Sequence, residues 1–233
     1  EVAYQPTLFS SLPLIQAETL WQSVGGQGQA GSGVKIAIID SGIDIHHPMF
    51  DSSTFAYPAG YPRGDGRYTT PKVIVSRAYF RPNDAPAPGE STPLPGPKAG
   101  SHGTHIAGIA AVRPVSARYG EVSAPISGVA PRAWLMNYRV FYPTAAGTAE
   151  VAYSPEILQA IEDAVGDGAD VICNGWSAIS TRSVFDSPIA EALENAMNAG
   201  SVVVAGAGNE GPGFGSASQL PGSIERVITV GAV

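Results

Sequence analysis

The sequence is poor in several residue types and patterns, and each absence excludes a class of protein. It holds one cysteine, Cys173, which excludes an internal disulfide and a metal site built from several cysteines. Thirteen basic residues stand against twenty acidic ones, a net charge of −7 with no basic cluster, so nucleic acid is not an expected partner. No apolar run approaches the ~18–20 residues that cross a bilayer, and no membrane span is expected.

What is present favours one large globular domain. The chain has 233 residues, of which 44% are hydrophobic, enough for a substantial core. The first ten residues, EVAYQPTLFS, show neither the basic nor the apolar region of a signal peptide. We therefore expect a soluble chain from which any secretion signal has already been removed.

Apolar runs and amphipathic stretches alternate along the chain. Helices are expected from about His102, from Ser154 and from Ser187, the last two marked by a serine–proline start. In the first of them, Ile106, Ile109 and Ala110 share one face, which we expect to be buried. Strands are expected at 34–39, 72–76, 133–141, 169–173, 201–207 and 227–230. Alternation with short connections predicts an α/β domain with a mostly parallel sheet and helices on both faces.

The chain changes character between Phe50 and Gly100. Residues 81–100, RPNDAPAPGESTPLPGPKAG, are rich in proline, which removes backbone donors and restricts the torsions that helices and sheets need. We expect a surface loop with some freedom to move. A decoration of the fold is the preferred interpretation, and a wall or lid of a cleft is the functional one. A linker between two domains is disfavoured because too few elements precede it.

Three short stretches place reactive side chains beside glycine-containing turns. In KIAIIDSGIDIHHP a buried strand ends at Asp40, which either accepts the N–H groups of a turn or serves at the sheet edge where ligands usually bind. In GSHGTHIAG His102 opens a helix, and in VVVAGAGNEGPG Asn209 follows an apolar strand. A metal held by His102 and His105 would lack a third ligand nearby. Taken singly, each motif also has a purely structural explanation.

Together, these motifs resemble those of the subtilisin-like serine proteases, or subtilases. AIIDSGID is similar to the aspartate motif of that family, SHGTHIAG to its histidine motif and AGAGNEG to its oxyanion asparagine motif, in the chain order of subtilisin. GVAPRAWLMNYRVF, ILQAIEDAVGDGADVI and RVITVGAV resemble the segments between and after them, so the resemblance covers roughly Trp21 to Val233. It implies a three-layer subtilisin-like fold and a secreted serine endopeptidase, made as a zymogen with a propeptide inhibitor.

The resemblance also implies a role for each motif residue in acyl transfer. His102 takes the proton from a serine hydroxyl and gives it to the leaving amine. Asp40 fixes the tautomer of His102 and stabilises its imidazolium, and Asn209 donates a hydrogen bond to the tetrahedral oxyanion. Protein or peptide is the expected substrate.

Substrate contacts are implied after the strand expected at 169–173. There Gly175, Trp176 and Ser177 align with the family's Ser-Leu-Gly, which pairs with the substrate backbone, although none of the three matches it, and Gly208 precedes Asn209 within the oxyanion motif. Trp176 either lines a pocket for an apolar side chain or packs across the sheet edge. Cys173 is interpreted as a small core hydrophobe.

One member of the catalytic set is missing. The family carries its nucleophile in a Gly-Thr-Ser motif, and that tripeptide does not occur in these residues. We therefore expect residues 1–233 to be the N-terminal and larger part of a catalytic domain, with a Pro/Gly-rich insertion around 51–100. The nucleophile would then lie elsewhere in the same protease, on a later segment or a separate chain, and these residues alone would be inactive. The alternative is an inactive subtilase-like module or fragment that binds peptides or protein partners.

Two further departures concern metal and domain content. Met49 stands where subtilisins usually have an aspartate ligand of a structural calcium, so no metal site or cofactor is assigned, although calcium elsewhere stays open. Asp44, His46 and His47 are interpreted as a solvated turn.

The HPMF pattern and the long loop before His102 resemble those of the larger subtilases that carry an inserted protease-associated domain. A dinucleotide-binding fold is rejected, because the glycines of GSGVKIAIIDSG precede the strand.

Overall fold

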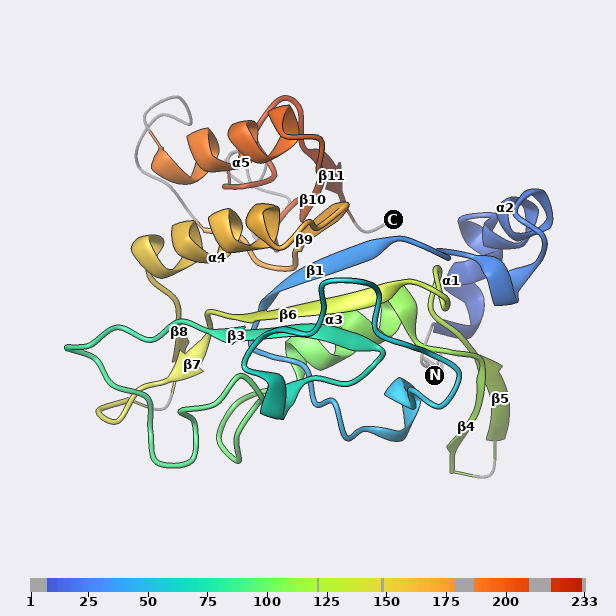
Figure 1. Cartoon of the computed structure of the whole chain (residues 1–233), viewed down its shortest axis with the longest axis horizontal. Coiled ribbons are helices and arrows are strands. Elements are labelled where there is room, and N and C mark those ends of the chain that lie inside the picture. Colours follow the sequence, from blue (N-terminus) through green and yellow to red (C-terminus); the bar gives the residue numbers. More distant parts are fainter. Residues whose placement is uncertain (1–7, 121, 148, 179–186, 210–218, 232–233) are drawn as a thin grey trace, which may run out of the picture.

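The computed structural model describes residues 8–120, 122–147, 149–178, 187–209 and 219–231. At its centre lies a seven-stranded sheet in the order β11-β10-β9-β1-β6-β3-β2, with every neighbouring pair parallel (Figure 1). The strands are β1 Lys35–Asp40, β2 Arg63–Gly64, β3 Val73–Ala78, β6 Trp134–Arg139, β9 Val171–Asn174, β10 Val202–Gly206 and β11 Ile228–Val230. The predicted parallel α/β sheet is confirmed.

Helices cover both faces of this sheet. On one face lies α3, His102–Ala111, and on the other lie α4, Ser154–Gly166, and α5, Pro188–Asn198 (Figure 1). The smaller elements are α1 Leu8–Leu14, α2 Ala17–Ser23, the 3-10 helices η1 Gln27–Gln29, η2 Pro48–Phe50 and η3 Gly66–Tyr68, and the hairpins β4 Val115–Tyr119 with β5 Val122–Ile126 and β7 Tyr142–Pro143 with β8 Glu150–Val151. None of the described helices is long and apolar enough to cross a membrane.

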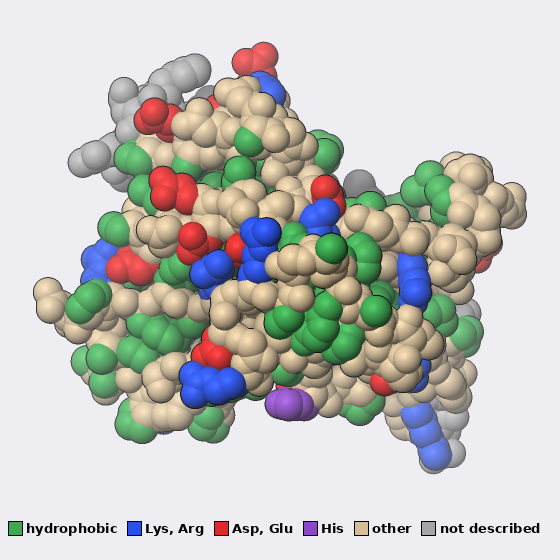
Figure 2. Space-filling view, in the orientation of Figure 1, with side chains coloured by type: hydrophobic (Ala, Val, Ile, Leu, Met, Phe, Trp, Pro, Cys, Tyr) green, Lys and Arg blue, Asp and Glu red, His purple; other side chains and the backbone are tan. Residues whose placement is uncertain are grey.

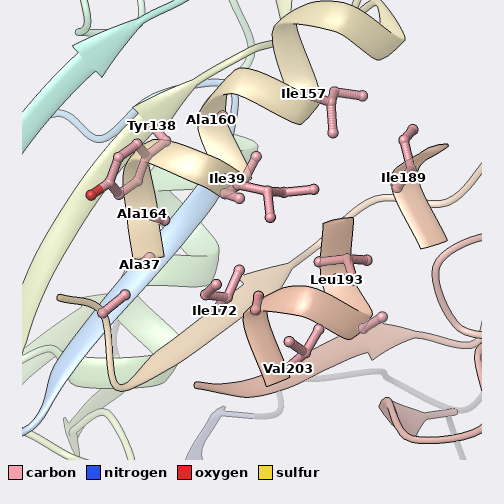
Figure 3. Close-up of a cluster of buried hydrophobic side chains, with 14 of the residues drawn as sticks. Ala37, Ile39, Tyr138, Ile157, Ala160, Ala164, Ile172, Ile189, Leu193 and Val203 are labelled. Atoms are coloured by element: carbon pink, nitrogen blue, oxygen red, sulfur yellow. The ribbon is translucent and has the colours of Figure 1, made fainter. Parts of the chain in front are cut away.

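The central strand β1 supplies both halves of the core because its side chains alternate between faces. Ala37 and Ile39 belong to the cluster under α4 and α5, whereas Ile36 and Ile38 belong to the cluster under α3. Figure 3 shows Ile39 among side chains from α4, α5 and the neighbouring strands. Burying such an aliphatic side chain contributes ~1.5–3 kcal/mol, so β1 is held rigidly on both sides.

The buried face of α3 differs from the prediction. Gly103, Ala107 and Ala111 face the sheet, whereas Ile109 is 38% exposed and Ile106 is half-buried. Hydrophobicity favoured the isoleucines, but only small side chains let the helix axis approach the strands closely. The predicted stripe was therefore wrong for Ile109, whereas Ile106 and Ala110 are partly buried and pack against the core, and the helix itself was predicted correctly.

The serine–proline signals mark the starts of α4 and α5 to within one residue. Ser154 is the first residue of α4 and not its N-cap, whereas Ser187 does precede α5. Neither helix has a side-chain hydrogen bond at its N-cap residue. Proline in the first turn, which lacks an N–H that would need a partner, is the feature both starts share.

The outer surface mixes charges of both signs. Basic and acidic side chains are interspersed over the face drawn in Figure 2. Several are paired, among them Arg77 with Asp167 at 2.8 Å and Lys35 with Asp170 at 2.7 Å. These pairs connect β1 and β3 to the loop that leaves α4.

Candidate active site

Asp40 is the last residue of β1 and is only 2% exposed. Its carboxylate Oδ1 accepts a hydrogen bond from the backbone N–H of Ser41 at 2.7 Å. Its own carbonyl oxygen accepts one from the N–H of Val140 at 2.9 Å. Backbone and side chain are therefore both fixed at the carboxyl edge of the sheet, where open α/β sheets usually bind ligands.

The turn after Asp40 requires glycine. Gly42 has φ 101°, a conformation that side-chain-bearing residues rarely adopt. Gly103, in the first turn of α3, packs against this turn so closely that an added Cβ would lie 2.7 Å from the carbonyl oxygen of Gly42 and 3.0 Å from Cβ of Asp40. The turn and the start of α3 therefore form one tightly packed unit.

His102, the first residue of α3, meets Asp40 in this unit. Its Nδ1 lies 2.9 Å from Oδ1 and 3.1 Å from Oδ2 of Asp40, while 58% of the His102 side chain is exposed. The hydrogen bond to Asp40 raises the pKa of His102, burial lowers it, and the charges of Asp40 and Glu150 raise it further, with a net rise. Nδ1–H donates to the carboxylate in this arrangement, which leaves Nε2 as the basic nitrogen.

Ser41 links the two residues, a role that the sequence reasoning missed. Its hydroxyl oxygen accepts a hydrogen bond from the N–H of Gly103 at 3.0 Å, and the residue is 1% exposed. The first N–H groups of a helix lack partners within the helix, so a buried hydroxyl next to the Asp40 turn satisfies one of them. The available signal in the sequence was a serine directly after the aspartate that ends the strand, at the sheet edge where the helix from His102 was expected to begin.

Asn209 lies three residues beyond β10 and is exposed. Because β10, β9 and β1 are neighbours in the parallel sheet, Asn209 emerges at the same edge as Asp40. Gly208 before it has φ 95°, and its Cα faces the carboxamide of Gln219, which is 3% exposed. Gln219 was not singled out in the sequence. Residues 210–213 of the asparagine motif lie outside the described residues.

The predicted substrate-binding stretch follows β9. An added Cβ at Gly175 would lie 2.9 Å from Oδ2 of Asp40 and would overlap the side chain of Ile106, so only glycine fits. Trp176 is 8% exposed and its ring lies 6.4 Å from that of Phe141, which agrees with packing across the sheet edge. Ser177 is exposed. The substrate-binding role of these residues and of Gly208 stays a prediction.

The other residues considered in the sequence do not form a cluster. The N–H of His46 donates to Asp44 at 3.0 Å, and Nδ1 of His47 accepts from the N–H of Met49 at 3.3 Å, as in a solvated turn. Among the described residues, no group of three or more His, Cys, Asp or Glu side chains is placed to hold a metal ion.

Cys173, in β9, has its pKa raised to about 11, chiefly by burial and also by the charge of Asp40. The thiol is thus protonated at neutral pH and is not an activated nucleophile. This agrees with its interpretation as a small core hydrophobe.

Comparisons with known proteins place the chain in a family. The profile of the Subtilase family (peptidase S8) matches residues 31–233. The chain is 34% identical over 232 residues to the minor extracellular protease Vpr of Bacillus subtilis (strain 168), and that alignment covers all of this chain and 24% of Vpr. It is 31% identical to the subtilisin-like protease SBT2.2 of Arabidopsis thaliana, covering 91% of this chain and 26% of that protein.

The fold has a counterpart among solved structures. The prenylagaramide maturation protease PagA superposes with a TM-score of 0.56 at 19% identity, over 91% of this chain and 58% of that one. The chain therefore belongs to the subtilase family and has its three-layer α/β fold. It spans about a quarter of the length of the two curated relatives named above.

Proposed function

We propose that this chain is the part of a serine endopeptidase that carries the general base, its orienting carboxylate and an oxyanion donor. The observation that carries the proposal is the hydrogen bond between Nδ1 of His102 and the buried carboxylate of Asp40, with most of the imidazole left exposed. A protein or peptide is the substrate, and hydrolysis of a peptide bond is the reaction.

The chemistry follows from this geometry once a serine hydroxyl stands near Nε2 of His102. Nε2 removes the hydroxyl proton while the serine oxygen attacks the carbonyl carbon of the substrate. The side-chain amide of Asn209 donates to the resulting oxyanion. His102 then gives its proton to the leaving amine, and the C–N bond breaks to leave an acyl-enzyme. Water, deprotonated in the same way, releases the acid product and restores the serine.

The serine is proposed to come from residues of the same protease that are not among these 233. No Gly-Thr-Ser occurs in the sequence. In the described part of the chain, the edge strand β11 carries exposed Ile228 and Val230, at 55% and 58%, and Val202 of β10 is 46% exposed. Exposed apolar side chains grouped at one sheet edge mark a surface that another segment covers.

Secretion, a propeptide and an inserted protease-associated domain belong to the same proposal. One relative is named as an extracellular protease, which supports secretion of this one. Structural calcium is a proposal without a ligand set among the described residues.

The test uses the full-length protein and a tagged fluorophosphonate, which reacts with activated serines. We expect labelling of the wild type, loss of labelling in His102→Ala, and retention in His105→Ala. His105 is the matched control because it lies three residues further along the same helix and is exposed, without a contact to Asp40. Equal labelling of both variants would refute the role of His102. No labelling of folded wild type would favour the inactive peptide-binding module.

A second measurement addresses Asn209. Replacing it with alanine should lower kcat on a peptide substrate by ~10²–10³ with little change in KM, because the donor acts on the oxyanion and not on the ground-state substrate. An unchanged kcat would remove Asn209 from the mechanism.

A further inference from the structure

The proline-rich segment is anchored by a buried ion pair. Glu90 in this segment and Arg139 at the end of β6 are both fully buried, with 2.6 Å between Nη2 of Arg139 and Oε2 of Glu90. The segment is the expected surface loop, since most of residues 81–100 are exposed or half-buried, but the sequence analysis did not foresee this buried anchor. Two charges removed from water must find partners within the protein, and both do.

Arg139 organises the loop through backbone carbonyls. Nη1 of Arg139 donates to the carbonyl oxygens of Glu90, Thr92 and Leu94, at 3.0, 2.9 and 2.5 Å. Its Nε donates to the carbonyl oxygen of Phe141 at 3.2 Å. The prolines prevent this segment from forming regular secondary structure. Its backbone carbonyls therefore lack the N–H donors of a helix or sheet, and the guanidinium of Arg139 supplies donors instead.

The carboxylate of Glu90 does the same for the N–H groups that follow. It accepts from the backbone N–H of Gly96 at 3.1 Å, of Lys98 at 2.7 Å and of Ala99 at 3.2 Å. Burial alone would raise the pKa of Glu90, but the hydrogen bonds from Arg139 and from these N–H groups hold it below its ordinary value. Residues 90–99 are therefore folded around one ionised pair.

This folded segment lies directly on the turn that carries Asp40. An added Cβ at Gly42 would lie 2.6 Å from the carbonyl oxygen of Pro93, 3.2 Å from the nitrogen of Pro95 and 3.2 Å from Cδ of Arg139. On its other side the same turn touches Gly103 of α3. The turn is thus clamped between the proline-rich segment and the helix that begins with His102.

A neighbouring strand position adds a further anchor. Asn137, which is 1% exposed, donates from Nδ2 to the carbonyl oxygen of Pro93 at 3.0 Å. The segment ends at Gly100, whose carbonyl oxygen lies 3.5 Å from the hydroxyl of Ser41 and whose N–H donates to Glu150 at 2.9 Å. Gly100 is two residues before His102, so the anchored segment leads directly into the catalytic helix.

We propose that Arg139 and Glu90 are positioning residues for the catalytic pair: by holding residues 90–99 against the Gly42 turn, they fix the carboxylate of Asp40 relative to His102. This inference rests on the proposed peptidase function. Neither residue touches the substrate in this scheme. Their effect passes through the turn, and a displacement of about 1 Å there is enough to lower turnover by ~10²-fold.

The test compares Glu90→Gln with Glu156→Gln in the full-length protein. Glutamine keeps the size of Glu90 and an acceptor oxygen but not the charge that pairs with Arg139. Glu156, which lies in α4, is the matched control. It pairs at 3.1 Å with Arg81, the first residue of the same proline-rich segment. We expect Glu90→Gln to lower kcat by about 10–100-fold with KM within about threefold, and Glu156→Gln to keep kcat within about twofold.

A readout independent of peptidase activity separates this proposal from the proposed function. The pH dependence of His102 modification by diethyl pyrocarbonate, followed by peptide mass spectrometry, reports the pKa of His102. We expect Glu90→Gln to move that pKa downward, toward the ordinary value for histidine, because the hydrogen bond with Asp40 is disturbed. If wild type proves inactive, a downward move still supports positioning, and an unchanged pKa overturns it.

Two further outcomes are decisive. If Glu90→Gln is folded and keeps the kcat of the wild type, the pair is only structural and the proposal is overturned. If Glu90→Gln does not fold, Arg139→Lys replaces it, since lysine keeps the charge but has its donors on a single nitrogen and cannot reproduce the contacts that Nε, Nη1 and Nη2 of the guanidinium make. For that variant we expect the same loss of kcat, and a kcat equal to wild type would again overturn the proposal.

Discussion

Replacing Gly103 by alanine should separate Asp40 from His102 without replacing either residue. Gly103 lies in the first turn of α3, and the Cβ of an alanine there would lie 2.7 Å from the carbonyl oxygen of Gly42 and 3.1 Å from Oδ1 of Asp40. Ordinary contacts with a Cβ begin near 3.4 Å. The start of α3 must therefore move by roughly 0.7 Å, because the nearest opposing atom, the carbonyl oxygen of Gly42, belongs to a backbone turn that is itself packed from behind.

The size of that movement predicts the effect on activity. The distance from Nδ1 of His102 to Oδ1 of Asp40, now 2.9 Å, would grow to roughly 3.6 Å, which is longer than a hydrogen bond. We expect kcat to fall by ~10²-fold and the pKa of His102 to fall with the lost interaction. The free energy of unfolding should change little, because the ~1 kcal/mol that alanine gains in helix propensity offsets part of the ~1–3 kcal/mol that overpacking costs.

Gly108 provides the matched control in the same helix. An added Cβ at Gly108 meets nothing within 4 Å, so Gly108→Ala should raise the free energy of unfolding by ~1 kcal/mol and leave kcat unchanged. Both variants are compared by steady-state kinetics on a peptide substrate and by urea unfolding. A Gly103→Ala protein with the kcat of the wild type and an unchanged pKa of His102 would refute the idea that this close approach sets the geometry of the pair.

Three further predictions concern titratable groups. Asp40→Asn should lower kcat by ~10⁴-fold, as in comparable triads, and shift the acid limb of the pH profile of kcat/KM to lower pH, because the hydrogen bond and charge that raise the pKa of His102 are lost; an acid limb that stays in place would contradict the assignment. Cys173, with its pKa raised to about 11 by burial, should react with a thiol reagent at pH 8 about 10²-fold more slowly in the native than in the unfolded protein, and equal rates would contradict its burial. Lys72 is 1% exposed and donates to the carbonyl oxygens of Pro131 and Ala133, and burial, followed by the charge of Arg132, lowers its pKa to about 7. Between pH 7 and 9 the unfolded chain therefore holds this proton and the folded chain does not, so stability should rise with pH by up to ~1.4 kcal/mol per unit, and Lys72→Met should remove that slope in urea unfolding; identical slopes would refute the lowered pKa.

Local sequence patterns were sufficient for the main strands and helices and for the candidate motif residues, but not for α1, α2, β2 or the two hairpins. Strand β1 reads as an apolar run that stops at Asp40, and the glycine after it permits the turn that the structure shows at Gly42. Parallel strands bring their carboxyl ends to one edge, so the sequence also placed Asp40 and Asn209 on the same side of the sheet. The family resemblance assigned His102 to Asp40 as its partner, and the structure brings the two together.

Other features depended on long-range packing, and the sequence misjudged or missed them. Hydrophobicity predicted a buried face of Ile106, Ile109 and Ala110 on α3, yet the fully buried positions are Gly103, Ala107 and Ala111, and Ile109 is exposed. The proline content correctly predicted a surface loop, but nothing local reveals that Glu90 in it meets Arg139, which lies 49 positions along the chain.

The sequence by itself determined the approximate position of the six main strands and three main helices, and it pointed to Asp40, His102 and Asn209 as the candidate reactive residues near their ends. Those properties depend on residue type, periodicity and turn chemistry within a few positions. Only the tertiary structure decided how these residues are held, through Ser41 between the Asp40 turn and α3, and through the buried pair of Glu90 and Arg139 behind that turn. A buried polar group is stable only with a partner, and the fold, not the local sequence, decides which distant residue becomes that partner.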